Sequence, residues 1–174
     1  DLEPIQEGTG DPSPSNVRPI RGHSGVDVKE RGFNRLDEET VFASFPQLEK
    51  QADGSWYTNQ LSQLINKTVW ENDNEIEGSI CLSFDYKYES ASSAGLRFKA
   101  YYTDGTSGSF YTSTSQVFAR RTGTTPSNKT VSRIAFDYGS DGVGSYIKNV
   151  CINVSDPERN GDYEPYQGLE VEQN

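Results

Sequence analysis

The sequence predicts an all-β protein, an antiparallel β-sandwich or jelly roll of about eight strands with at most one short helix. Apolar and polar residues alternate in several segments, turn-forming Asp-Gly and Gly-rich stretches separate these segments, and no long stretch has helical spacing. The length of 174 residues favours one domain. Only 32% of the residues are hydrophobic, but the ten tyrosines and eight phenylalanines carry large buried areas, which argues against disorder.

Composition divides the chain into three segments. Residues 1–40 are predicted to form an irregular Pro/Gly-rich connector, because proline removes backbone donors and glycine favours turns. A plain flexible linker is the alternative for this segment. Residues 41–160 are predicted to hold the sandwich, and residues 161–174 an exit segment or linker to a following domain. The chain contains no methionine, which we interpret as the mark of a piece of a longer protein.

The first expected elements are short. Residues 47–51 and 55–58 are predicted to pair as a hairpin around Asp53-Gly54. Residues 59–67 have helical spacing through Leu61, Leu64 and Ile65, so a short helix is expected there. A strand at residues 67–71 follows.

The central strands show the clearest alternation. In residues 79–89 one face carries only apolar and aromatic side chains, namely Ile80, Leu82, Phe84, Tyr86 and Tyr88. The same pattern predicts further strands at residues 96–102, 131–139 and 145–154, with a shorter one at residues 116–121. Such strands are half-buried, with one side facing a core.

The formal charge of −10 is concentrated at the two ends of the chain. Residues 1–40 hold nine acidic and five basic residues, and residues 155–174 hold six and one, whereas the middle is close to neutral. No basic face for a nucleic acid is visible, so we expect no nucleic-acid partner. No apolar run approaches the ~18 residues of a membrane span, so we expect no membrane insertion.

No catalytic or metal site is predicted. His23 is the only histidine and has no nucleophile beside it, and the chain contains no Gly-x-Ser-x-Gly sequence. The acidic run at Glu71, Asp73, Glu75 and Glu77 lacks the spacing of a calcium loop, and we interpret it as a solvated surface; a structural calcium ion is the alternative. Cys81 and Cys151 are expected to be free thiols, with a cross-strand disulfide as the alternative.

Aromatic residues with polar neighbours are the candidates for ligand binding. Sugar rings stack on aromatic faces and hydrogen-bond to polar groups, so a glycan site combines both kinds of residue. By this criterion the tentative ligand-binding residues are Trp56, Tyr57, Trp70, Asp85, Arg97 and Tyr101. The alternative for both tryptophans is a place in the core, because buried aromatics are common in a thin sandwich.

Two flanking motifs carry a family resemblance. The stretch "PIQEGTGDPSPSNVRPI" followed by Gly22, and "YEPYQG" near the other end, resemble paired signatures of prophage tail and tail-fibre-like proteins of Gram-positive gut bacteria. In that group the module between the signatures resembles a galactose-binding-type β-sandwich of carbohydrate-binding modules. The group commonly continues with Gly-Lys-Asn-Leu, whereas residues 32–36 here read "GFNRL".

The resemblance implies a non-catalytic module that adheres to bacterial surface glycan. It further implies other tail proteins as partners and a place in the virion tail, assembled in the bacterial cytoplasm. A purely structural spacer, which positions a neighbouring receptor-binding or lytic domain, is the alternative function. A secreted or cell-surface module attached to a glycoside hydrolase is a third interpretation.

Overall fold

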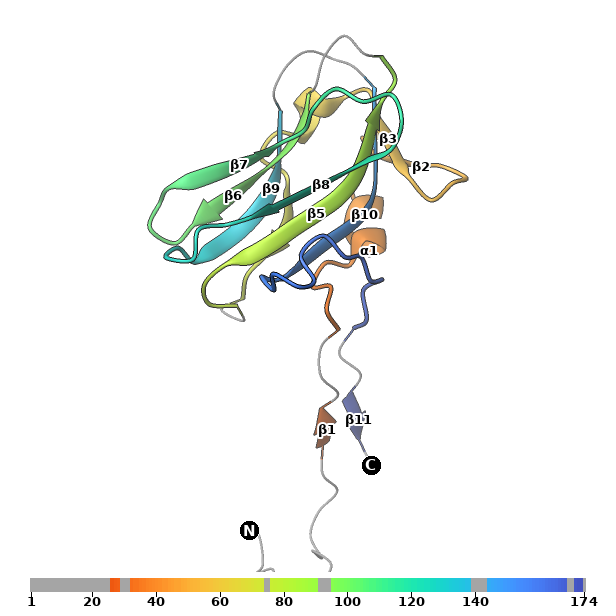
Figure 1. The fold of residues 1–174 in the computed structure, drawn as a ribbon. Coiled ribbons are helices and arrows are strands. Elements are labelled where there is room, and N and C mark those ends of the chain that lie inside the picture. Colours follow the sequence, from red (N-terminus) through yellow and green to blue (C-terminus); the bar gives the residue numbers. More distant parts are fainter. Residues whose placement is uncertain are drawn as a thin grey trace, which may run out of the picture. The chain divides into compact units, whose positions relative to one another are not determined.

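The computed structural model describes residues 26–28, 32–73, 76–90, 95–138, 144–168 and 171–173 (Figure 1). It divides into two units, one made of residues 1–30 with 169–174 and the other of residues 31–168. Most of the expected N-terminal connector, including His23, lies outside the described residues.

The first unit contains one pair of described strands. β1 (Val26–Val28) pairs antiparallel with β11 (Val171–Gln173), with Val26 opposite Gln173. The chain segments just before and just after the second unit are therefore hydrogen-bonded neighbours, although they lie far apart in the sequence.

The second unit is an antiparallel β-sandwich, which confirms the predicted fold class (Figure 1). Its five-stranded sheet has the order β2 (Glu49–Lys50), β3 (Trp56–Thr58), β10 (Ser145–Val154), β5 (Ile80–Tyr88), β8 (Ala119–Thr124). Its four-stranded sheet has the order β4 (Thr68–Glu71), β9 (Val131–Tyr138), β6 (Leu96–Tyr102), β7 (Ser107–Tyr111).

Aromatic rings from both sheets fill the space between them. The ring of Phe98 on β6 lies 4.9 Å from that of Phe84 on β5 and 4.9 Å from that of Phe136 on β9, measured between centroids. Phe42 joins the same cluster, 5.5 Å from Phe136. These rings are almost completely buried, so the core depends on aromatic packing, as the composition predicts.

The helices differ from the prediction in place and type. An α-helix, α1 (Glu38–Ala43), precedes the sandwich, and the side chain of Asp37 caps it by accepting a hydrogen bond from the Thr40 amide at 3.1 Å. It buries Phe42 in the core. Where the sequence predicts a helix at residues 59–67, the structure has the 3₁₀ turn η1 (Leu61–Leu64), which still buries both leucines.

Two strands also depart from the prediction. β7 was not expected, and the strand expected at residues 116–121 is β8, at Ala119–Thr124. β10 contains an irregularity between Lys148 and Cys151, where Asn149 adopts a positive φ of 53°. Because of this bulge, the Val150 amide turns away from β5 and bonds the Glu38 carboxylate at 2.7 Å.

The two ends of the second unit lie side by side. A Cβ placed on Gly32 would lie 3.1 Å from the Cβ of Gln167, and the buried side chain of Asn34 donates to the carbonyls of Val150 and Glu164, both at 3.1 Å. The unit is thus longer than the 41–160 module expected from alternation, because residues 32–40 and 161–168 pack onto the same body.

Candidate functional site

The two tryptophans among the predicted ligand-binding residues belong to the core. Trp56 is only 4% exposed and packs edge-on against Phe42, with ring centroids 5.9 Å apart. Trp70 is 9% exposed and stands opposite Ile134 in the register of β4 and β9. Both tryptophans therefore lie in the core, which was the alternative to ligand binding, and neither ring is available for stacking on a ligand.

The other four candidates lie on two opposite outer surfaces of the sandwich. Tyr57 and Asp85 lie on the outer face of the five-stranded sheet, and Arg97 and Tyr101 lie on the outer face of the four-stranded sheet. All four are half-buried. The six predicted ligand-binding residues therefore do not form one site, because the four that are not in the core are divided between two opposite faces.

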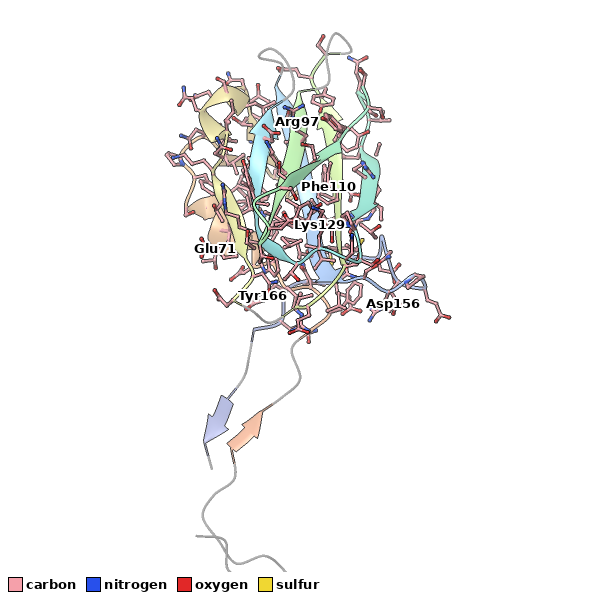
Figure 2. The ribbon with its side chains drawn as sticks, turned by 90° about the vertical axis from the view of Figure 1, so that its left-hand side faces the viewer. Glu71, Arg97, Phe110, Lys129, Asp156 and Tyr166 are labelled. Atoms are coloured by element: carbon pink, nitrogen blue, oxygen red, sulfur yellow. The ribbon has the colours of Figure 1, made fainter. Side chains whose placement is uncertain are left out.

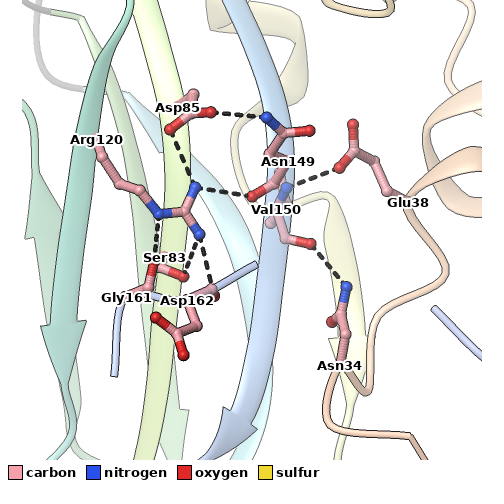
Figure 3. A network of polar contacts seen from close by, with 9 residues as sticks. All are labelled: Asn34, Glu38, Ser83, Asp85, Arg120, Asn149, Val150, Gly161 and Asp162. Atoms are coloured by element: carbon pink, nitrogen blue, oxygen red, sulfur yellow. Dashed lines mark hydrogen bonds and ion pairs between the residues drawn. The ribbon is translucent and has the colours of Figure 1, made fainter. Parts of the chain in front are cut away.

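Asp85 belongs to a polar network that fixes the C-terminal segment of the unit (Figure 3). Arg120 forms an ion pair with Asp85 at 3.0 Å, donates to the Ser83 hydroxyl at 2.8 Å, and also donates to the backbone carbonyls of Gly161 and Asp162 at 2.5 and 3.2 Å. A guanidinium suits such a role because its donors point in several fixed directions. The Asp85 carboxylate is occupied by these structural contacts, which leaves it little capacity for a ligand.

Residues 161–168 cover part of this outer face, including both cysteines. Cys81 and Cys151 are buried and free, as predicted. Burial raises the pKa of the Cys151 thiol to about 11, against a smaller lowering by a backbone hydrogen bond from Glu164. Cys151 is therefore an uncharged thiol at neutral pH, and it is not an activated nucleophile.

The uncovered part of this face holds an aromatic group with two lysines. The rings of Tyr57 and Tyr146 lie 4.7 Å apart, and the Tyr57 hydroxyl donates to Glu89 at 3.3 Å. Lys87 and Lys148 place their ammonium groups 4.8 and 4.0 Å from the centroid of the Phe118 ring. The rings of Tyr57, Phe118 and Tyr146 are all half-buried, and none of these three is fully exposed for stacking on a ligand.

The outer face of the four-stranded sheet presents a first tyrosine–arginine pair around Tyr101. The guanidinium of Arg133 lies 3.8 Å from the centre of the Tyr101 ring, and the two residues stand opposite each other on β9 and β6. The Tyr101 hydroxyl donates to the side-chain oxygen of Asn66 at 2.5 Å, and Arg133 donates to the Thr68 hydroxyl at 3.1 Å. An aromatic ring, a cation and an amide therefore meet at one place.

A second tyrosine–arginine pair lies further along β6, around Arg97, which is labelled in Figure 2. Tyr111 on β7 stands opposite Arg97 on β6, whose guanidinium lies 5.2 Å from the Tyr111 ring centre and pairs with Asp137 at 2.9 Å. The Tyr111 side chain is 61% exposed, more than any other described aromatic residue. Tyr111 thus offers a ring, and its neighbours a donor and an acceptor, to a molecule from solvent.

We call these residues, namely Asn66, Arg97, Lys99, Tyr101, Tyr111, Arg133 and Asp137, the four-stranded face. Arg97 and Tyr101 are four residues apart on β6, which separates the two tyrosine–arginine pairs by about 13 Å at ~3.3 Å per residue. The serines of β7 opposite Lys99 and Tyr101 add hydroxyl groups between the pairs. The arrangement suits an extended polar ligand that lies along the sheet.

A hollow at one end of the sandwich is a weaker candidate. It has a volume of about 420 Å³ and is lined by Ile76, Glu77, Gly78, Thr103, Ser127, Asn128, Lys129 and Thr130. No aromatic side chain lines it, and Lys129 is already engaged in an ion pair with Asp104 at 2.6 Å. A hollow of this kind lacks the stacking surface that a sugar ring requires.

Within the described ranges, no group of three or more His, Cys, Asp or Glu residues is placed to hold a metal ion. Glu75 in the acidic run considered for calcium lies outside those ranges. Likewise, no helix among the described residues is long and apolar enough to span a membrane.

Of the four-stranded face, sequence reasoning found only Arg97 and Tyr101; it missed Asn66, Lys99, Tyr111, Arg133 and Asp137. Lys99 could have been predicted from the sequence, because the alternation in residues 96–102 places it on the same side as Arg97 and Tyr101. Tyr111 was missed because β7 was not predicted. Arg133 could be placed beside Tyr101 only by knowing that β6 pairs with β9.

Comparison with known proteins gives limited results. No protein-family model matches the chain, and no curated protein matches it. Among solved structures the chain is similar to the CBM22-1 xylan-binding domain of Paenibacillus barcinonensis Xyn10C, with a TM-score of 0.39 and 15% sequence identity. The match covers 76% of this chain and 82% of that one, and at this distance it indicates neither a ligand nor a site for the present chain.

Proposed function

We propose that the chain is a non-catalytic carbohydrate-binding module of a phage or prophage tail-associated protein, and that it adheres to bacterial surface glycan through the four-stranded face. The observation that carries this proposal is the pairing of exposed Tyr111 and half-buried Tyr101 with Arg97 and Arg133 on one uninterrupted sheet surface. Aromatic rings stack on the C–H faces of sugars, while the neighbouring amide, carboxylate and guanidinium groups meet the hydroxyls.

The tail context of the proposal rests on the two flanking motifs. A shallow sheet surface buries only part of a glycan, so each site would bind weakly. Several copies on one particle would raise the overall avidity without any new contact. Weak binding at each site is thus compatible with firm adhesion of a virion tail to a cell.

The test is binding of the chain, displayed multivalently on beads, to an array of bacterial glycans, with Tyr101→Ala and Tyr111→Ala as variants. Each substitution removes a stacking surface, so we expect at least about a tenfold loss of binding, equivalent to ~1.4 kcal/mol. Tyr166→Ala is the matched control, because Tyr166 is 43% exposed and lies toward the other end of the sandwich from Arg97 (Figure 2).

A spacer module is the second candidate function. The observation that favours it is the closeness of the two ends of the sandwich unit, where Gly32 meets Gln167, together with the pairing of β1 with β11. This is the geometry of a module inserted into a longer chain. If no glycan on the array binds the multivalent chain, adhesion is refuted and the spacer function takes its place.

A further inference from the structure

We propose that the four-stranded face binds an acidic polysaccharide, a chain that carries carboxylate or phosphate groups at intervals. This inference rests on the proposed function and specifies its ligand. It is carried by the charge of the face, which is opposite in sign to that of the protein as a whole.

The four-stranded face carries three cations and one carboxylate. Arg97 and Lys99 project from β6, Arg133 projects from β9, and only Arg97 has an acidic partner, Asp137. Glu71 stands opposite Arg133 in the register of β4 and β9 but forms no ion pair with it. Among the described residues, therefore, neither Lys99 nor Arg133 forms an ion pair with a carboxylate, although Glu71 lies across from Arg133 on the same side of the sheet.

These cations lie in a chain with a formal charge of −10, whose acidic excess is concentrated in residues 1–40 and 155–174. A group of cations on a sandwich that is otherwise close to neutral attracts anions locally. The attraction is directed to one face and sets the orientation in which an anionic chain approaches.

The Tyr101 ring restricts the movement of the two cations beside it, Arg133 and Lys99. The guanidinium of Arg133 and the ammonium of Lys99 lie 3.8 and 5.4 Å from the centre of the Tyr101 ring. Stacking restricts the guanidinium, so less side-chain entropy is lost when it binds an anion. The bond from Arg133 to the Thr68 hydroxyl uses one donor and leaves others for a carboxylate or phosphate.

The length of the face favours a chain over a single charged sugar. The two tyrosine–arginine pairs are about 13 Å apart along β6, which exceeds one sugar ring. Lys99 stands between Arg97 and Tyr101 on the strand, so the cations form a row along the direction that the ligand would follow.

The experiment measures binding of the 174-residue chain to three soluble polymers: polygalacturonate, its fully methyl-esterified form, and a phosphomannan. The ester keeps the sugar backbone and removes the charge, and the phosphomannan distinguishes phosphate from carboxylate recognition. We expect binding to at least one acidic polymer at least about tenfold tighter than to the ester, and we expect this binding to weaken as salt is raised.

The variants are Lys99→Gln and Arg133→Gln, with Lys148→Gln on the opposite sheet as the matched control. Each site variant should weaken binding to the acidic polymer about fivefold to tenfold, whereas the control should not, and circular dichroism confirms that all three fold. Equal binding to the ester and the acidic polymers overturns this inference and leaves glycan binding standing.

Two further results overturn the inference. Duplex DNA that binds as tightly as the best acidic polymer would mark the face as a general polyanion surface. A chain that binds none of the three polymers and no glycan on the array refutes the proposed function itself, and the inference with it.

Discussion

Replacing Glu38 by glutamine is expected to abolish part of the pH dependence of stability. Glu38 is the first residue of α1, is only 8% exposed, and accepts a hydrogen bond from the Val150 amide at 2.7 Å (Figure 3). Burial raises the pKa of its carboxyl from 4.5 to about 7, and this outweighs the lowering by the Val150 N–H and by Lys50. Glutamine keeps an oxygen for Val150 but cannot ionise.

The sign follows from proton linkage. Because the folded state holds the proton more tightly than the unfolded state, the contribution of Glu38 to stability is complete below pH 4.5 and is lost as the pH rises to about 7. A pKa difference of this size corresponds to about 3 kcal/mol at ~1.36 kcal/mol per unit. The free energy of unfolding of the glutamine variant, relative to that of the wild type, should therefore rise by about 3 kcal/mol between pH 4.5 and pH 8.

Urea unfolding at several pH values, followed by tryptophan fluorescence, measures this difference. Subtracting the two curves removes the contribution of every other titrating group, because these groups are common to both proteins. If the two free energies of unfolding change in parallel from pH 4.5 to pH 8, Glu38 does not carry the linkage and the reasoning from its burial is refuted.

Two other predictions concern the core and the C-terminal segment. Trp56→Ala should lower the free energy of unfolding by about 3–5 kcal/mol in thermal or urea denaturation, because it leaves a cavity beside Phe42; a loss under about 1 kcal/mol would contradict its placement in the core. Arg120→Ala should release residues 161–168, because Arg120 donates to the carbonyls of Gly161 and Asp162. Thiol labelling of Cys151 should then be at least about tenfold faster, since a loss of ~1.4 kcal/mol of local stability increases the open population about tenfold. Arg121→Ala, one residue along β8, is its control, and equal labelling rates in the two variants would show that Arg120 does not fasten the segment.

The strongly alternating strands were predictable to within about one residue at each end. The observed bounds of β5 and β6 lie within one residue of the predicted ones, because each strand has an apolar face that only one register can bury. The strand β7 was not predictable from the sequence, because Ser107, Gly108 and Ser109 offer no apolar face. Gly108 nevertheless fits closely there, because a Cβ would lie 2.8 Å from the Tyr102 hydroxyl and would force that side chain to shift.

The sequence before α1 carries a helix-start signal. Asp37 followed by Glu38 and Glu39 is a typical N-terminal cap with acidic residues in the first turn. The segment was assigned to the connector because its neighbours are rich in glycine and proline. The helix depends on tertiary packing of Phe42, which local sequence does not reveal.

The candidate site was predictable only within single strands. Alternation places Arg97 and Tyr101 on one face correctly, but it does not say which strands are neighbours. Arg133 and Tyr111 reach that face through long-range pairing of β6 with β9 and β7. The tryptophans were misleading for a related reason, since a large ring beside a turn is equally suited to closing the core.

The meeting of Gly32 with Gln167 has an evolutionary consequence. A domain whose N- and C-terminal ends lie side by side can be exchanged by recombination for another domain with the same property, whatever its length. β1 and β11 would still be able to pair. The whole outer surface of the module would then change in one genetic event, without substitution residue by residue.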